Sequence, residues 1–248
     1  MYKLGNHYLL CGDATNQDDV KKLMQNNKSS LILSDPPYNV DYSGRGNNNL
    51  GKIENDAMSN KEFLEFLDKS FNNYFIYSLN NASIYIFHGD SKSEQKLAFE
   101  EIYKRYFYKS STLIWVKQSA GMGWQDYRVQ HEPILYGWKE SDKKHNFYGD
   151  RTKTTILEYK RENVNNYVHP TQKPLDLLIE LIKNSSRTND IVIDYFGGSG
   201  ATLIACEKSK RICYMMEYDP KYCDVIIERW ENLTGEKAQL IEKDQDDS

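Results

Sequence analysis

The chain has 248 residues, 39% of them hydrophobic and 27% charged, which is the composition of a globular protein with one full core. It contains no run of about 18 apolar residues and no basic-then-apolar start, so we expect neither a membrane-spanning nor a secreted protein but a cytoplasmic one. The four cysteines form no CxxC pair and the five histidines are scattered, which argues against a disulfide framework and a metal site.

The net charge of −4 is unevenly distributed along the chain. Residues 231–248 hold six acids against two lysines, whereas residues 143–161 hold six basic residues against two acids. Because charges more than about 10 Å apart are screened in ordinary salt, the local basic stretch can still attract phosphate groups. It is equally well explained as a solvated surface.

Short apolar runs alternate with amphipathic stretches along most of the chain. We expect strands at 8–12, 31–34, 83–87, 112–116, 133–136, 190–194 and 212–217. We expect helices at 16–25, within 54–79, and at 93–106, 174–184 and 201–209. This order predicts an α/β fold with a mostly parallel sheet. The strands 112–116 and 133–136 are close enough in sequence to form an antiparallel hairpin at the edge of that sheet.

Residues 137–168 have weak periodicity and are predicted to form an irregular insertion. Aromatic and basic side chains alternate there, a composition typical of nucleic-acid contact surfaces and also found in ordinary cores. Residues 39–51 are rich in glycine and asparagine, which suits a lid over an active site as well as a plain surface loop.

The strand at 31–34 ends in the turn Asp35-Pro36-Pro37-Tyr38. Each proline fixes its backbone and offers a carbonyl but no N–H, so the turn is rich in hydrogen-bond acceptors and poor in donors. The Asp35 carboxylate adds an acceptor, and Tyr38 supplies a flat ring for stacking. These groups suit a planar base with an exocyclic NH₂, such as adenine or cytosine, although a proline turn with a buried tyrosine would have the same sequence.

A second polar turn follows the strand at 190–194 and contains Phe196, Gly198 and Gly200. The next strand ends on Glu217, so that strand, glycine turn, helix, strand and acid follow in the order of a nucleotide-binding unit. A P-loop requires Lys and then Ser or Thr after its last glycine, but Ala201-Thr202 follows Gly200. A nucleophile elbow centred on Ser199 requires glycine where Ala201 stands. A dinucleotide fingerprint that starts at Gly198 requires glycine where Leu203 stands. One nucleoside-like cofactor is therefore favoured over NAD.

These two turns together resemble the DNA amino-methyltransferases that use S-adenosyl-L-methionine, in the permuted β class. His131-Glu132-Pro-Ile-Leu-Tyr136 and His169-Pro-Thr-Gln-Lys173-Pro174 are also similar to that family, so the resemblance covers nearly the whole chain. One departure is Tyr195, where the family usually has proline.

The resemblance implies a Rossmann-like sheet of seven mostly parallel strands with an antiparallel last strand, circularly permuted. It divides the chain into a catalytic part at 1–136, a target-recognition insertion at 137–168, a cofactor-binding part at 169–235 and an acidic tail at 236–248. The circular permutation costs little stability because the carboxyl ends of the strands still meet around one cleft.

The resemblance also assigns roles to single residues. Asp35 and the Pro36 carbonyl, with Pro37 in the same turn, would accept hydrogen bonds from the amino group of a flipped base on which Tyr38 stacks. The cofactor would be held by Asp13, Lys173, Asp194, Phe196, Gly198, Gly200 and Glu217. DNA would be contacted by Arg45, Lys117, Arg128, Lys143, Lys144, Arg151 and Lys153. His88 is better explained as a satisfied histidine at a strand end than as a base.

The implied activity is methylation of adenine N6 in duplex DNA. Asp35, rather than serine, before the prolines favours adenine, and cytosine N4 is the alternative. Cytosine C5 is disfavoured because no proline precedes a cysteine. An RNA- or protein-directed methyltransferase and a silent DNA-binding module are the remaining rivals. A homodimer and a cognate restriction endonuclease are possible partners that the sequence leaves open.

Overall fold

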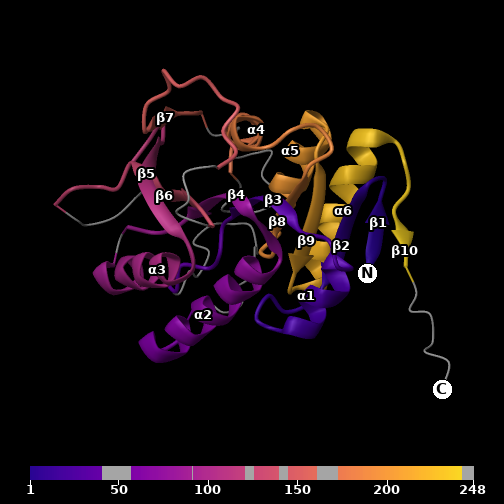
Figure 1. Ribbon diagram of the computed structural model, residues 1–248, viewed down its shortest axis with the longest axis horizontal. Helices are drawn as coiled ribbons and strands as arrows, with labels where there is room; N and C mark the ends of the chain where they lie inside the picture. The colour runs from indigo at the N-terminus through magenta and orange to yellow at the C-terminus, as the bar shows by residue number, and fades with distance from the viewer. Residues whose placement is uncertain (41–56, 91, 121–125, 140–144, 161–172, 242–248) are drawn as a thin grey trace.

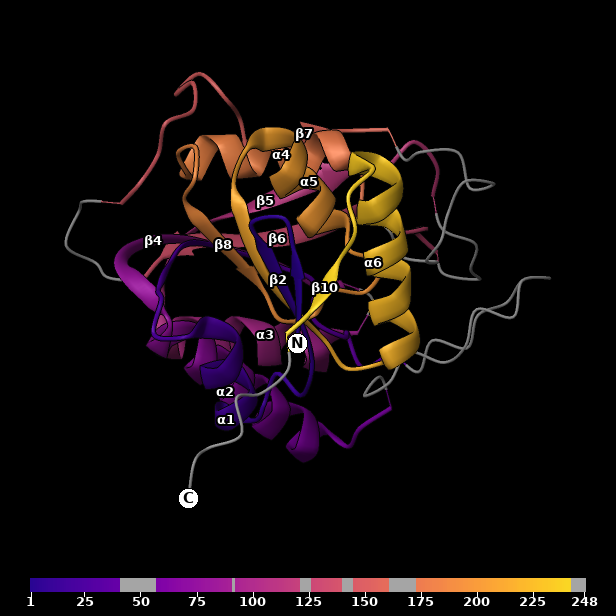
Figure 2. The same cartoon turned by 90° about the vertical axis from the view of Figure 1, so that its right-hand side faces the viewer.

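The computed structural model describes residues 1–40, 57–90, 92–120, 126–139, 145–160 and 173–241, and the structural statements below concern these residues. In the described residues, six helices cover the two faces of a single sheet (Figures 1 and 2). One face packs against α1 (Gln17–Met24), α2 (Asn60–Ile76) and α3 (Ser93–Tyr106). The other packs against α4 (Leu175–Ser185), α5 (Ala201–Ser209) and α6 (Pro220–Thr234).

The strand order is β10-β1-β2-β9-β8-β3-β4-β6-β5-β7. The strands are β1 (Tyr2–Leu4), β2 (His7–Cys11), β3 (Ser29–Ser34), β4 (Ser78–Phe87), β5 (Tyr108–Val116), β6 (His131–Trp138), β7 (Ile156–Glu158), β8 (Ile191–Asp194), β9 (Ile212–Glu217) and β10 (Gln239–Leu240). The central strands β2, β9, β8, β3 and β4 are parallel. β6 is antiparallel to both β4 and β5.

The central strands are buried on both faces. Leu31 and Leu33 of β3 belong to the core under α4 to α6, whereas Ile32 belongs to the core under α1 to α3. Because successive side chains of a strand point to opposite faces, a continuous apolar run such as this one requires cover on both sides. The polar residues that follow the run therefore lie at the rim of the sheet.

All seven expected strands are present. The strand expected at 133–136, which is the last strand of the implied fold, is β6, and it is antiparallel as expected. The sheet nevertheless has ten strands in the described residues, because β1, β7 and β10 add to its edges. These are two or three residues long, too short for an alternating pattern to be recognised. The expected antiparallel hairpin is confirmed as the β5–β6 pair. Its β6 strand lies on the inner side, next to β4, and the short β7 adds to the outer side of β5.

Helix α6 was not expected from the sequence, although it has clear end signals. Asp219 caps it by accepting the Lys221 N–H at 2.9 Å, Pro220 opens its first turn, and Gly235 ends it with φ of +76°. Its Trp230 donates to Glu207 of α5, which also pairs with the buried His7 of β2. α6 is thereby fixed against the last turn of α5.

None of the helices in the described residues is long and apolar enough to cross a lipid bilayer. Among the same residues, no group of histidine, cysteine and acidic side chains is arranged to hold a metal ion.

Candidate active site

The two turns singled out in the sequence lie side by side at one edge of the sheet. β3 pairs in parallel with β8, with Leu31 opposite Val192 and Ile32 opposite Ile193. The carboxyl ends of both strands, which carry Asp35 and the glycine turn, therefore meet. Ser34 joins them directly, because its hydroxyl donates to Asp194 Oδ1 at 2.8 Å across 160 positions of sequence.

Asp35 is the centre of a network of charged groups. Its Oδ1 accepts a hydrogen bond from the Tyr38 hydroxyl at 2.5 Å, and its Oδ2 accepts one from the Lys173 ammonium. Lys173 also pairs with Glu132 Oε2 at 3.2 Å, and Glu132 Oε1 pairs with Lys117 at 2.6 Å. Two carboxylates and two ammonium groups thus alternate, while 25% of the Asp35 side chain remains accessible to a ligand.

The environment of Asp35 sets its protonation. Burial raises the pKa of the Asp35 carboxyl, the Lys173 ammonium opposes this effect, and the charge of Glu132 adds to it. The pKa of Lys173 is lowered by burial but raised further by Asp35 and Glu132, with a net rise. Lys173 therefore stays charged and is the main group that opposes the rise in the pKa of the half-buried Asp35.

The Tyr38 ring is held on several sides. A Cβ at Gly89, just after β4, would come within 3.2 Å of the ring, so glycine permits this close approach. Phe99 of α3 meets the ring edge-on at 6.2 Å, and the Lys173 ammonium lies 5.7 Å from its centroid. Asn39 follows in the left-handed conformation and exchanges two hydrogen bonds with the backbone of Met58.

The glycine turn has the backbone that its sequence predicts. Gly200 has φ of +79°, which a residue with a Cβ rarely adopts, and its N–H closes the turn on the Gly197 carbonyl at 2.8 Å. The Gly198 N–H donates to Glu217 Oε2 at 2.6 Å. Arg229 of α6 donates to the Ser199 carbonyl at 2.6 Å and so braces the turn from the outside.

Acceptor groups surround this turn. Glu217 ends β9, and Asp13 follows the neighbouring β2, with the Gly12 N–H bonded to the Glu217 carbonyl at 3.0 Å. Burial raises the pKa of Glu217, and hydrogen bonds from the backbone N–H groups of Asp219 and Gly198 oppose the rise. The half-buried Phe196 ring packs on Phe66 of α2 at 5.6 Å.

Asp194 faces the protein rather than an open space. It is 3% exposed, and its carboxylate accepts hydrogen bonds from Ser34, from Thr202 at 2.7 Å and from the Phe196 N–H at 3.1 Å. Burial raises its pKa to about 7 against these hydrogen bonds. Asp194 therefore stabilises the turn through these hydrogen bonds. Its contact with the methionine end of a cofactor stays a prediction.

A family model described as DNA methylase, for the N6 and N4 methylases, matches residues 29–228, which include both turns. The chain belongs to this DNA methylase family. It is therefore an enzyme of the class expected from the sequence.

Two curated relatives match over most of their length. The Type II methyltransferase M.HpaI of Haemophilus parainfluenzae is 27% identical over 245 residues, covering 89% of this chain and 73% of the relative. The DNA adenine methyltransferase YhdJ of Escherichia coli strain K12 is 26% identical over 246 residues, covering 86% and 80%.

Solved methylase structures share the fold. M1.HpyAVI in complex with SAM has a TM-score of 0.66 and 22% identity, covering 90% of this chain and 98% of the other. The cytosine-N4-specific PvuII DNA methyltransferase has a TM-score of 0.70 and 15% identity, covering 94% and 92%. At these identities the likeness establishes a methylase fold and leaves the target base open.

The residues expected to contact DNA differ in their surroundings. Arg45, Lys143 and Lys144 lie outside the described residues, as does the loop at 41–51. Arg128 and Arg151 are exposed. Lys117 pairs with Glu132 and so belongs to the charged network around Asp35, and its contact with DNA stays a prediction.

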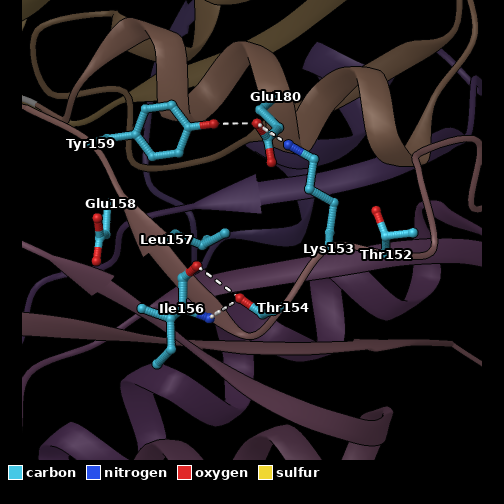
Figure 3. Close-up of a pocket in the computed structure, with 8 residues that line it drawn as sticks. All are labelled: Thr152, Lys153, Thr154, Ile156, Leu157, Glu158, Tyr159 and Glu180. Atoms are coloured by element: carbon cyan, nitrogen blue, oxygen red, sulfur yellow. Dashed lines mark hydrogen bonds and ion pairs between the residues drawn. The ribbon is translucent and has the colours of Figure 1, made fainter.

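Lys153 lines a cavity of about 320 Å³ between β7 and α4 (Figure 3). Its ammonium pairs with Glu180 at 3.2 Å, and Glu180 also accepts a hydrogen bond from the Tyr159 hydroxyl (Figure 3). The charge of Lys153 is thus locally balanced, so a DNA phosphate would have to compete with Glu180 for it.

Sequence reasoning missed three residues of this methylase site. Glu132 lies in a motif that was recognised, but its pair with Lys173 could not be read from two stretches 41 positions apart. Ser34 is the last residue of the apolar run, and only strand pairing shows its partner. Tyr74 belongs to the amphipathic pattern of α2 and has the sequence signal of an ordinary core residue.

Proposed function

We propose that this protein is a site-specific DNA methyltransferase that moves a methyl group from S-adenosyl-L-methionine to N6 of an adenine flipped out of duplex DNA. One observation carries the proposal: the acceptor turn at Asp35 and the glycine turn at 197–200 end adjacent parallel strands and are joined through Ser34 and Asp194. A base held at the first turn and a nucleoside cofactor held at the second would meet at one edge of the sheet.

The groups around the glycine turn fit the cofactor. Glu217 and Asp13 end neighbouring strands, and a carboxylate has lone pairs for ligand hydroxyl and amino groups beyond those used by its backbone donors. We assign Glu217 to the ribose hydroxyls, Asp13 to the adenine and Phe196 to packing on the cofactor. When bound, S-adenosyl-L-methionine supplies a methyl group on a positively charged sulfur, and the chain supplies position and electrostatics.

The groups around Asp35 fit an exocyclic amine. An arylamine lone pair is delocalised into its ring, so the nitrogen is a poor nucleophile. Asp35 and the Pro36 carbonyl accept hydrogen bonds from its two N–H groups, draw the nitrogen toward tetrahedral geometry and stabilise the positive charge that develops on it. Tyr38 stacks on the base, and no covalent bond between enzyme and base is required.

Lys173 takes a role at Asp35 in this account. Its ammonium donates to one Asp35 oxygen and also pairs with Glu132. The amino group of an arriving base therefore competes with Lys173 for Asp35, and Lys173 can keep its pair with Glu132 when the base binds. Contact of Lys173 with the methionine end of the cofactor stays a prediction.

Adenine is favoured by Asp35 in place of serine and by the family relative named as a DNA adenine methyltransferase. The relative M.HpaI is named a Type II methyltransferase, which makes a cognate restriction endonuclease a prediction for this protein too. A homodimer remains a further prediction, and both are tested by co-purification and by the mass of the protein in solution.

The test uses the purified protein with isotopically labelled S-adenosyl-L-methionine and, in separate reactions, duplex DNA, RNA and a protein extract. We expect label in duplex DNA, and N6-methyladenine when the DNA is digested to nucleosides and analysed by mass spectrometry. If the digest contains N4-methylcytosine instead, the target base is cytosine and the adenine assignment is refuted. Label in RNA or protein with none in DNA would refute it.

A further inference from the structure

A chain of directed hydrogen bonds links the two turns through helix α2. The Tyr195 N–H donates to the Tyr74 hydroxyl at 2.8 Å, and the Tyr74 and Ser34 hydroxyls are 2.7 Å apart. Ser34 then donates to Asp194 Oδ1 at 2.8 Å. All four residues are at most 3% exposed, so water does not compete for these groups.

The direction of the chain follows from its two ends. The Tyr195 N–H can only donate, so the Tyr74 oxygen accepts there and its own proton is left for Ser34. Asp194 Oδ1 accepts from the Phe196 N–H as well, so the Ser34 proton points to it. Each hydroxyl thus has one donor and one acceptor, and reversing either would leave a buried group unsatisfied.

Tyr195 holds Tyr74 through both its backbone N–H and its ring. A proline could not donate an N–H to Tyr74. Here the two tyrosine rings stack with centroids 4.4 Å apart and planes within 2° of each other. The backbone donor and the stacked ring therefore hold Tyr74 in the one place where its hydroxyl reaches Ser34.

The location of this chain points to a function beyond packing. Ser34 immediately precedes Asp35, and Asp194 immediately precedes the glycine turn, so the chain ties together the last strand residues before both ligand sites. α2 adds a third fixed point through Tyr74. A shift of either turn would change the distance between the amino group and the methyl group, on which the rate depends steeply.

We propose that Tyr74, held by Tyr195, is a positioning residue for methyl transfer that sets the separation between the Asp35 turn and the cofactor turn. The proposal rests on the proposed function. It assigns no contact with base or cofactor to Tyr74, because its effect acts through Ser34 and Asp194.

The test compares Tyr74→Phe with Tyr85→Phe in the full chain. Tyr85 is a matched control on the other face of the sheet: it is 2% exposed, its hydroxyl is 2.8 Å from that of Ser185, and its ring stacks on Tyr136 at 4.7 Å. Both changes remove one buried hydroxyl and keep the ring. The change Tyr195→Pro is less suitable because it would also remove a stacked ring.

We expect Tyr74→Phe to lower kcat on duplex DNA by about 10- to 100-fold at saturating cofactor. Its Kd for S-adenosyl-L-methionine, measured by calorimetry, should stay within about threefold of that of the wild type, since no ligand contact is lost. Tyr85→Phe should lower thermal stability by a similar amount and leave kcat within about twofold. The double variant Tyr74→Phe/Ser34→Ala should be no slower than the slower single variant, because both changes break one chain.

Three results would overturn the positioning role: a kcat for Tyr74→Phe like that of Tyr85→Phe, a loss of kcat matched by an equal loss of cofactor affinity, or effects of Tyr74 and Ser34 that multiply. A wild-type protein without activity on any DNA would instead refute the proposed function. The two failures are thereby distinguished.

Discussion

Replacing Lys173 with methionine removes the ammonium that lies between two carboxylates. The Lys173 side chain is 6% exposed, that of Glu132 13% and that of Asp35 25%. Removal of one partner from a buried ion pair lowers the free energy of unfolding by about 3–5 kcal/mol. Because Asp35 is partly exposed, we expect Lys173→Met to lower it by about 3 kcal/mol.

The same change should alter the pH dependence of the reaction. With Lys173 gone, burial and the charge of Glu132 raise the pKa of Asp35 further, and only the hydrogen bond from Tyr38 still opposes the rise. The carboxylate must be ionised to accept two donors, so activity is lost as the pH falls through this pKa. We therefore expect the acid limb of the kcat profile to move to higher pH in Lys173→Met.

The assay measures kcat against pH at saturating cofactor, together with urea unfolding of each protein. Lys109→Met is the matched control, because Lys109 of β5 pairs with Glu100 of α3 in a half-buried site that includes neither Asp35 nor Glu132. It should lose stability and keep the wild-type acid limb. An unmoved acid limb in Lys173→Met, or an equal movement in Lys109→Met, would refute the role of Lys173 at Asp35.

Three further changes test single residues. Asp35→Ala should lower kcat by about 100-fold or more while cofactor affinity stays within a few-fold, and equal loss of both would remove Asp35 from the reaction. Glu217→Ala should weaken cofactor binding by about 1–3 kcal/mol in calorimetry, and unchanged binding would separate it from the ribose. Asp194 has a folded-state pKa of about 7, above its ordinary value of 3.8, so its stabilising contribution is full below about pH 4 and is lost as the pH rises through 7. The unfolding free energy of Asp194→Asn, relative to the wild type, should therefore rise with pH by at most about 1.4 kcal/mol per unit between pH 4 and 7, and a flat difference would contradict the raised pKa.

The sequence predicted the central sheet and the meeting of the two turns for a physical reason. Apolar runs that end in polar residues are buried strands, and the carboxyl ends of parallel strands lie at one edge of a sheet. Asp35 and Glu217 could therefore be placed at the site from their position after such runs. The edge strands β7 and β10 could not be predicted, because their pairing comes from neighbours that are distant in sequence.

The charged network was beyond the reach of sequence patterns. The family resemblance implied a cofactor contact for Lys173 and a DNA contact for Lys117, and both stay predictions. In the structure both bind Glu132, and Lys173 also binds Asp35 across 138 positions. Ion pairs of this kind depend on the fold as a whole, which a local motif does not specify.

The central claim is that a base at Asp35 and a cofactor at the glycine turn react at one edge of the sheet. Methylation-sensitive sequencing of DNA from cells that make the wild-type protein, compared with cells that make Asp35→Ala, tests it most directly. We expect N6-methyladenine in one short recurring sequence with the wild type and none with the variant. Unmethylated DNA in both, or equal methylation in both, would contradict it.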